Sequence, residues 1–302
     1  MPDRHIPIVR RSELICPGNS PKMMAKAAVS DADQVIFDLE DGCAVSQKVV
    51  ARQLVIDALR TLDFGGKIRA YRANGLTTPY CYRDIIDVVE AAGDFVDVII
   101  LPKIDDAPDV NFFDRLLTQI EANIGQEVGR IRLEALIESA KGVLHAEAIA
   151  TSTPRLSGLI FGLVDFAGDI GAQEVGAEQF FYYHYAKAKA IVAARAAGLT
   201  VVDGVTLAVR DLEACRRDSA IAARMGFEGK WAIHPTQVPI INAAFTPTAE
   251  QIARAQRIIE VYDQADAARG AGVIVIDDEM IDAATLRVER KRLEIARKAG
   301  LL

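Results

Sequence analysis

Short runs of β-branched and other apolar residues alternate with stretches of helical periodicity between about residues 13 and 245. Parallel strands connected by crossover helices produce this alternation. Eight parallel strands close a (β/α)8 barrel, so the strand candidates predict an α/β fold of the TIM-barrel type. The candidates are residues 14–16, 35–38, 68–72, 96–101, 133–137, 158–161, 200–203 and 230–233.

Apolar residues recur at helical spacing between the strand candidates, for example over residues 82–92 and 178–197. An open, doubly wound sheet is the alternative to a closed barrel, and it would also bind ligands at the carboxyl ends of its strands. No G-x-G-x-x-G motif follows the first strand candidate. This argues against a dinucleotide-binding version of the open sheet.

The residues after the eighth strand candidate do not follow the barrel repeat. Residues 248–267 have helical spacing and begin with Thr-x-x-Gln, which is close to a capping box. A glycine-rich turn and two short strand candidates follow, and residues 283–299 have the pattern of a closing helix. We therefore expect a barrel domain at residues 1–246 and a C-terminal helix–hairpin–helix extension at residues 247–302.

The composition is that of an ordinary globular enzyme, with 51% hydrophobic and 25% charged residues among 302. A net charge of −7 argues against a nucleic-acid partner, because phosphate neutralisation requires a dense basic patch. No apolar run approaches the length of a membrane span, and the basic N-terminus is not followed by a long apolar region. The scattered cysteines lack disulfide or zinc spacing, so we expect a cytoplasmic protein. They are Cys16, Cys43, Cys81 and Cys215.

Charged residues follow nearly every strand candidate. In (β/α)8 barrels the chemistry gathers at the carboxyl ends of the strands, whereas the opposite end mainly stabilises the fold. These positions are therefore the candidate site. They are Asp38, Glu40, Asp41, Arg72, Lys103, Glu138, Asp165, Asp203 and His234.

The pooled carboxylates predict a hard cation, because no cysteine or histidine cluster offers softer ligands. Glu138 and Asp165 are the candidates for direct ligands of Mg²⁺, with Mn²⁺ as a substitute, since adjacent strands would bring them together. Asp38, Glu40 or Asp41 would lie outside the set of direct ligands, where they would hold metal-bound water and pair with nearby basic residues. The alternative is a structural ring of salt bridges at the mouth of the barrel.

Three kinds of basic residue are candidates for binding. Arg72 is a planar, two-pronged donor suited to a carboxylate or a developing enolate oxygen, although it could instead pair with Asp41. His234, in Ile-His-Pro, is interpreted as a turn residue and not as a catalytic base. Lys22 and Lys26 lie four residues apart after a Ser-Pro helix start and could hold phosphates. The same spacing also occurs on plain solvated helices.

The chain resembles the citrate lyase beta subunit family of the HpcH/HpaI aldolase superfamily, which includes malyl-CoA, β-methylmalyl-CoA and citramalyl-CoA lyases. The resemblance spans nearly the whole length, and the ordered set of motifs makes it specific. The motifs are CPGNSPKMMAK at 16–26, FDLEDG at 37–42, RAN at 72–74, LPK at 101–103, IES at 137–139, VDFAGDIGA at 164–172, GKWAIHPTQV at 229–238 and MID at 280–282.

The resemblance implies a TIM-like barrel in a homotrimer or homohexamer, with Mg²⁺ at Glu138 and Asp165. It implies a catalytic set of Arg72, Glu40, Asp41 and Asp282. Asp282 would be the acid/base group, delivered by the C-terminal extension as a lid over a neighbouring subunit's site. It also implies a substrate and CoA site that includes Arg72, Lys22, Lys26, Lys103, Ile233 and His234.

The chain departs from the family pattern at two places. Many relatives have Gly-Glu-Asp where this chain has Leu163-Val164-Asp165, so a carboxylate beside the expected metal ligand is missing. A glycine is also common where Asp278 precedes Glu279. These departures leave the metal prediction in place and concern the substrate pocket.

The expected reaction is cleavage or formation of a 3-hydroxyacyl-CoA such as malyl-CoA, β-methylmalyl-CoA or citramalyl-CoA. The products of cleavage would be acetyl-CoA or propionyl-CoA and a 2-oxo acid, glyoxylate or pyruvate. Two alternatives stay open. The chain could be the beta subunit of a citrate lyase complex acting on a carrier-bound citryl thioester, or an aldolase for free 2-oxo acids, against which Lys22, Lys26 and the C-terminal extension argue.

Overall fold

The computed structural model describes residues 9–173, 175, 182–269 and 272–302. The chain divides into two compact units, which we call the barrel unit, Arg10–Asn242, and the C-terminal unit, Ala243–Leu302. Within the described residues, no helix is both long enough and apolar enough to cross a membrane.

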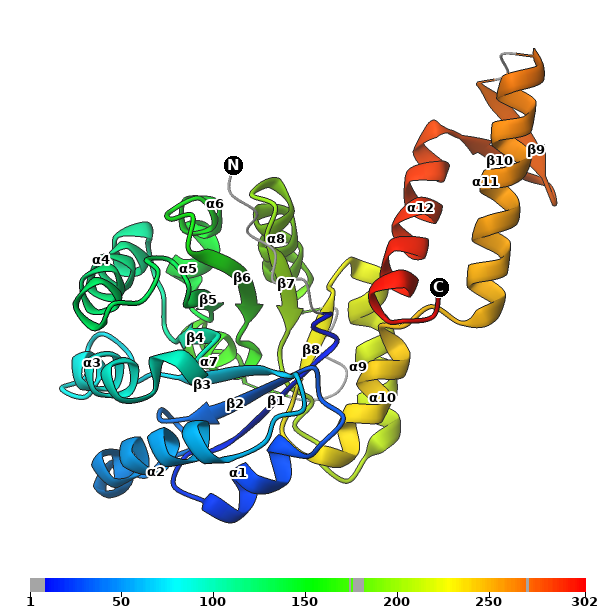
Figure 1. The fold of residues 1–302 in the computed structure, drawn as a ribbon. Coiled ribbons are helices and arrows are strands. Elements are labelled where there is room, and N and C mark those ends of the chain that lie inside the picture. The colour runs from blue at the N-terminus through cyan, green and yellow to red at the C-terminus, as the bar shows by residue number, and fades with distance from the viewer. Residues whose placement is uncertain (1–8, 174, 176–181, 270–271) are drawn as a thin grey trace. The chain divides into compact units, whose positions relative to one another are not determined.

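The barrel unit is built on a ring of parallel strands that closes when β8 pairs with β1 (Figure 1). Across the described residues the closed ring contains eight strands, so the predicted TIM-type barrel is confirmed and the open sheet is excluded. The strands are β1 (Ser12–Pro17), β2 (Gln34–Asp38), β3 (Ile68–Arg72), β4 (Val98–Leu101), β5 (Arg132–Ile137), β6 (Leu156–Phe161), β7 (Thr200–Asp203) and β8 (Gly229–Ala232).

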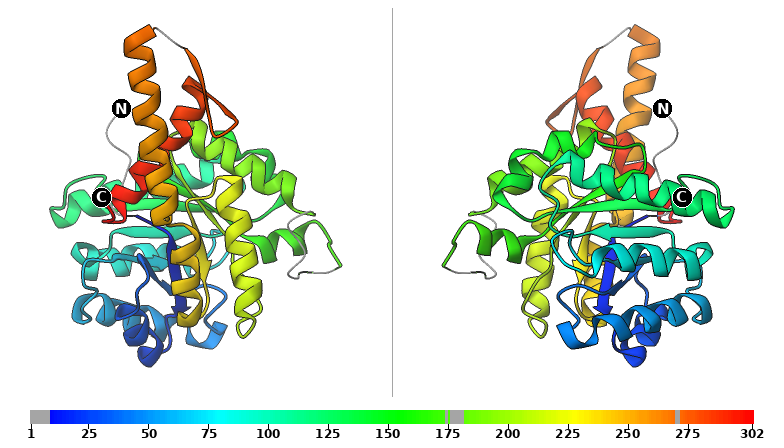
Figure 2. Two further views of the ribbon diagram at one scale, coloured as in Figure 1. Left: turned by 90° about the vertical axis from the view of Figure 1, so that its right-hand side faces the viewer. Right: turned by 90° about the vertical axis from the view of Figure 1, so that its left-hand side faces the viewer.

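Helices surround the strands, as the views from three sides show (Figures 1 and 2). The helix α3 illustrates why: Ile85, Val88 and Val89 are fully buried at the spacing of one helix face. The predicted helix over 178–197 appears as α8 from residue 184 onward, while its positions 178–181 lie outside the described residues. The helices are α1 (Pro21–Ala28), α2 (Lys48–Thr61), α3 (Cys81–Ala92), α4 (Ala107–Ile124), α5 (Ala140–Leu144), α6 (Ala146–Ala150), α7 (Leu163–Asp169), α8 (His184–Ala196), α9 (Leu212–Met225) and α10 (Val238–Ala244).

The inside of the barrel is layered because alternate residues of each strand point inward. A middle layer is apolar and includes Ile36, Ile100 and Trp231. Below it, toward the amino ends of the strands, Gln34 donates to Glu134 across the barrel at 3.0 Å. The inward positions at the carboxyl ends therefore lie above a packed floor, and polar side chains there face a pocket.

The C-terminal unit consists of α11 (Ala249–Arg269), an antiparallel hairpin of β9 (Val273–Ile276) and β10 (Glu279–Asp282), and α12 (Ala283–Lys298). Thr248 and Gln251 exchange hydrogen bonds at the start of α11, which confirms the predicted capping box. The hairpin turn places Asp277 and Asp278 at positive φ, 51° and 64°. Aspartate tolerates this conformation better than most residues.

Candidate functional site

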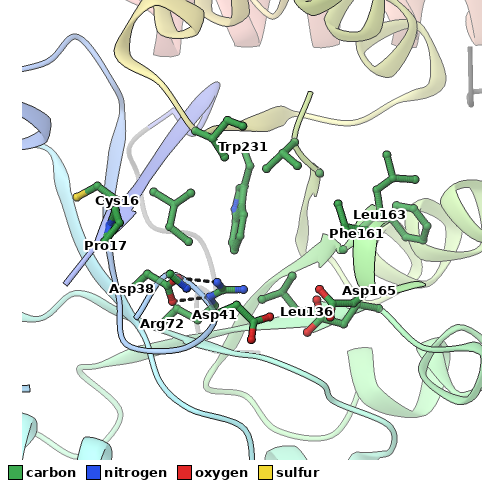
Figure 3. A pocket seen from close by; sticks show the side chains of 18 of the residues that line it. Cys16, Pro17, Asp38, Asp41, Arg72, Leu136, Phe161, Leu163, Asp165 and Trp231 are labelled. Atoms are coloured by element: carbon green, nitrogen blue, oxygen red, sulfur yellow. Dashed lines mark hydrogen bonds and ion pairs between the residues drawn. The ribbon is translucent and has the colours of Figure 1, made fainter. Parts of the chain in front are cut away.

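A pocket of about 450 Å³ opens at the carboxyl ends of the barrel strands (Figure 3). Its polar lining comes from the ends of four strands and the loops that follow them, and its apolar lining includes Leu136, Leu163, Trp231 and Ile233. Figure 3 shows the Trp231 ring extending toward Arg72 and Asp165 on the opposite side of the pocket. The polar lining residues are Asp38, Asp41, Arg72, Glu138 and Asp165.

Arg72 and Asp38 end adjacent strands and form a two-pronged ion pair, with both N···O distances at 2.7 Å. Asp38 also accepts the backbone N–H groups of Glu40 and Gly42. Burial raises the pKa of Asp38, but the charge and hydrogen bonds of Arg72 outweigh it and hold that pKa below its ordinary value. Arg72 therefore pairs with Asp38, one of the acids expected to pair with a nearby base, and not with Asp41, the alternative partner.

Glu40 connects two cations at the mouth. Its carboxylate lies 3.0 Å from Nη1 of Arg72 and 2.5 Å from Nζ of Lys103. Asp41 is more exposed and lies 3.4 Å from the same Lys103 nitrogen. The loop that presents these acids requires Gly42, because a Cβ there would lie 2.5 Å from Oδ2 of Asp38.

Glu138 and Asp165 approach the pocket from neighbouring elements, the end of β5 and the first turn of α7. Oε1 of Glu138 accepts the backbone N–H of Lys103 at 2.7 Å. Burial raises the pKa of Glu138 to about 8, and the nearby charge of Asp165 adds to the rise. Gly162 permits this approach, since a Cβ at that position would lie 2.4 Å from Oε2 of Glu138.

The donor set of Glu138 and Asp165 fits a divalent hard cation that keeps open positions. Two carboxylates face the pocket with mutual repulsion that a cation would relieve. Within the described residues, no group of three or more His, Cys, Asp and Glu side chains forms a closed metal site. Magnesium accepts one or two carboxylates together with water and substrate oxygens, so these residues suit it.

The lysines of α1 are exposed. Lys22 and Lys26 lie on the surface, and Met23 between them lines the pocket. Pro21 is at the helix start as predicted, and Ser20 occupies the N-cap position. The Ser20 side chain makes no capping hydrogen bond in the described structure, so the serine of the predicted Ser-Pro helix start takes the cap position without the cap contact.

Two of the predicted strand-end residues, His234 and Asp203, form hydrogen bonds or ion pairs with neighbouring residues of the fold. His234 is exposed, and its Nδ1 lies 2.8 Å from Oγ1 of Thr236 in a short 3-10 turn, as the turn interpretation predicts. Asp203 does not reach the pocket: it is buried and pairs with Lys187 and Lys230, at 2.7 and 2.9 Å. Its neighbour Val202 occupies the inward position of β7, so Asp203 faces the helices.

Asp282 belongs to the C-terminal unit, where it ends β10 and caps α12. Its Oδ1 accepts the N–H groups of Ala284 and Thr285, each at 2.9 Å, and the hydroxyl of Thr285 at 3.1 Å. These hydrogen bonds lower the pKa of Asp282. The local role of Asp282 is thus a helix cap, and its part in catalysis stays a prediction.

Sequence reasoning missed a pair beneath the site. The Trp231 ring centroid lies 5.6 Å from Cζ of Arg72, and its indole N–H donates to Oε2 of Glu13 at 2.7 Å. Glu13 is fully buried. The signal that could have revealed it is an acid in the strand SELICP, at a position that alternates inward with Ile15.

The chain is similar to characterised enzymes along most of its length. A family model described as HpcH/HpaI aldolase/citrate lyase matches residues 11–235. An L-malyl-CoA/beta-methylmalyl-CoA lyase of Cereibacter sphaeroides is 39% identical over 292 residues, covering 92% of this chain and 91% of that protein. A citrate lyase subunit beta of Leuconostoc mesenteroides subsp. cremoris is 35% identical over 283 residues, covering 93% of this chain and 92% of that protein.

Among solved structures, the CitE protein of Mycobacterium tuberculosis in complex with magnesium, acetoacetate and coenzyme A has a TM-score of 0.79 and 28% identity. This match covers 98% of the present chain and 100% of that chain. Together with the sequence matches, it confirms the resemblance predicted from the ordered motifs.

Proposed function

The chain belongs to the HpcH/HpaI aldolase/citrate lyase family, and we propose that it is a carbon–carbon lyase that cleaves or forms a 3-hydroxyacyl-CoA. Malyl-CoA, β-methylmalyl-CoA and citramalyl-CoA are the proposed substrates. Acetyl-CoA or propionyl-CoA and a 2-oxo acid, glyoxylate or pyruvate, are the proposed products. The observation that carries the proposal is the pocket in which Arg72 faces Glu138 and Asp165.

Glu138 and Asp165 would hold Mg²⁺ in this pocket, with Mn²⁺ as a substitute. The magnesium in the M. tuberculosis structure supports the choice of metal. When bound, the metal supplies Lewis-acid polarisation of substrate oxygens. Lys103 contributes by holding Glu138 through its backbone N–H and by adding positive charge beside Glu40.

Arg72 would bind the substrate and stabilise negative oxygen as it develops. A guanidinium has five N–H groups. Two of them donate to Asp38, which leaves 5 − 2 = 3, and Nη1, which carries two of these three, also forms an ion pair with Glu40 at 3.0 Å. The remaining N–H groups are available to a carboxylate or an enolate oxygen. Because the two acids fix the guanidinium before substrate arrives, little reorganisation is needed during the reaction.

Proton transfer at the α-carbon would fall to Asp282 of a neighbouring subunit, with the C-terminal unit acting as a lid in a homotrimer or homohexamer. Glu40 and Asp41 would support the site by holding Arg72 and Lys103 in place. Exposed apolar residues of the hairpin, Val275 and Met280, are compatible with a lid that packs on another copy.

Lys22, Lys26, Ile233 and His234 would line the CoA site, with the two lysines meeting its phosphates. Free CoA should bind the wild-type protein, and Lys22→Ala or Lys26→Ala should weaken that binding. Lys67→Ala is the matched control, since Lys67 precedes β3 and so lies at the opposite end of the barrel. Equal affinity in all three variants would contradict this part of the proposal.

A cytoplasmic setting is proposed as well, supported by free thiols at all four cysteines.

A magnesium-dependent activity panel tests the proposed reaction. The purified protein alone is assayed with malyl-, β-methylmalyl-, citramalyl- and citryl-CoA, and released 2-oxo acid is measured. We expect cleavage of at least one of the first three, abolished by Glu138→Gln. Cleavage of none of them, with turnover of a free hydroxy-oxo acid, would favour an aldolase. Turnover of the citryl thioester alone would favour a citrate lyase beta subunit, the alternative that the 35% identical relative supports.

A further inference from the structure

Glu13 lies beneath the substrate pocket and Trp231 lines it, and we propose that the column formed by these two residues positions the guanidinium of Arg72 for substrate. The column runs from the amino end of the barrel interior to its mouth. The inference rests on the proposed function, in that it names two positioning residues for the same site.

The contacts of the column are continuous. Register pairs Glu13 of β1 with Trp231 of β8, so the two side chains start from adjacent positions on neighbouring strands. The carboxylate of Glu13 accepts the indole N–H at 2.7 Å, and the indole ring stands 5.6 Å from Cζ of Arg72. A guanidinium within about 6 Å of a tryptophan ring is attracted to its π face, and the attraction is stronger when the pair is desolvated.

Arg72 is restrained in two different ways. Asp38 and Glu40 hold its N–H edges, which sets the direction of its hydrogen bonds. These edge contacts set where the guanidinium lies, but they restrain only weakly a tilt of its plane toward the apolar floor of the pocket. The Trp231 ring occupies that side, so it limits the tilt and keeps the remaining N–H groups directed at one place.

Glu13 supplies what an apolar residue at its position could not, an acceptor for a buried indole N–H. The positive charge of Arg10 acts on Glu13, but the guanidinium donates to Glu134, Ser157 and Thr200. Oε1 of Glu13 has no hydrogen-bond partner among the described residues. Burying an acid under these conditions is costly, and its one formed hydrogen bond is the one that orients Trp231.

The competing explanation is that Trp231 merely fills the barrel core. Both explanations predict that large changes at Trp231 lower stability. The two explanations predict different kcat values for the single variants and for the double variants with Arg72. A residue that only fills the core would not affect kcat through the guanidinium. The two explanations also differ for the spectrum of Trp231, which is the single tryptophan of the chain and therefore reports on the column alone.

The experiment compares four variants with wild type at a temperature where all are folded by circular dichroism. Glu13→Gln keeps an acceptor oxygen, and kcat should stay within about threefold of wild type. Glu13→Met removes the acceptor and Trp231→Leu removes the ring, and each should lower kcat by about tenfold or more, with a smaller change in KM. Glu121→Gln is the matched control: Glu121 is a buried acid paired with Arg155, and its loss should lower the melting temperature without lowering kcat.

A double-variant cycle with Arg72→Lys completes the test. Adding Glu13→Met to Arg72→Lys should lower kcat by less than about threefold further, because the column has lost the group that it positions. Full multiplication of the two effects, or a kcat of Glu13→Met equal to that of wild type, would overturn the proposal.

Intrinsic fluorescence separates this inference from the proposed reaction. Glu13→Met and Arg72→Met should each shift the emission of Trp231, whereas Glu121→Gln should not. This readout does not require turnover, so a wild-type protein inactive on every thioester would defeat the proposed function and leave the column testable. Unchanged emission in both Glu13→Met and Arg72→Met would defeat the column.

Discussion

Asp38 and Arg72 face each other at the ends of adjacent strands, and both oxygens of the carboxylate accept N–H groups of the guanidinium at 2.7 Å. The pair is buried, with Asp38 3% and Arg72 8% exposed. A buried charge whose partner is removed becomes strongly unfavourable, so both members of the pair are needed for the mouth of the barrel to keep its geometry.

Arg72→Lys keeps the positive charge but loses the two-pronged geometry. We expect kcat/KM to fall by about 100-fold or more, equivalent to about 3 kcal/mol of transition-state stabilisation, because a lysine cannot hold Asp38 and reach substrate at once. Steady-state kinetics on the best thioester of the panel measures this. Asp38→Asn should also lower kcat/KM, and wild-type kinetics in either variant would contradict the assigned geometry.

Magnesium affinity should depend on pH through Glu138. The pKa of Glu138 without metal is raised to about 8, and the cation binds the ionised carboxylate. Magnesium affinity should therefore fall as pH falls below 8, and magnesium binding in that range should release protons. Isothermal titration at pH 6.5, 7.5 and 8.5, in buffers of different ionisation enthalpy, measures both effects. Glu138→Gln should lose the binding. An affinity independent of pH over this range would show that Glu138 is not a ligand.

Gly162→Ala should damage the metal site without unfolding the barrel. The added Cβ would lie 2.4 Å from Oε2 and 2.5 Å from Cβ of Glu138, so the glutamate must move. We expect magnesium affinity to fall by about tenfold or more, as is typical when groups that orient a ligand are disturbed. Gly168→Ala is the matched control, because a Cβ there meets no atom within 4 Å. Equal losses in both variants would indicate a general effect on α7.

Glu13 should make the free energy of unfolding depend on pH. Burial raises the pKa of Glu13 from 4.5 to about 7 in the folded state, so the folded protein holds a proton there that the unfolded chain releases. Its contribution therefore favours folding below pH 4.5 and is lost as pH rises toward 7, by at most about 1.4 kcal/mol per pH unit. Urea unfolding of wild type and Glu13→Gln across pH 5 to 7.5 measures it. The variant should show the shallower decline, and parallel curves would rule the effect out.

Asp282→Asn tests the lid. Asparagine can still cap α12, so the melting temperature should change little, while turnover should fall because the amide cannot exchange a proton. Mixing Asp282→Asn with inactive Arg72→Met protein, after subunit exchange, should restore part of the activity if the site is shared between subunits. Near-wild-type turnover of Asp282→Asn, or no recovery on mixing, would remove Asp282 from the proposed site.

Much of the mouth of the barrel could be predicted from strand ends. The sequence marks Arg72 and Glu138 as charged residues directly after apolar runs, and parallel strands bring such ends to one rim. The same logic failed for Asp203, because its side chain points outward from β7 and pairs with Lys187 and Lys230. The strand period alternates faces, and a strand buried on both sides gives no apolar contrast by which to tell them apart.

Local periodicity and motifs in a fixed order were sufficient to predict the barrel, the capping box of α11 and the set of residues at the mouth. Which side chains contact one another depends on the folded chain. Trp231 reaches Glu13 across 218 positions of sequence, and only the closure of β8 onto β1 brings them together. Such contacts depend on strand neighbours and side-chain direction, which local pattern does not encode.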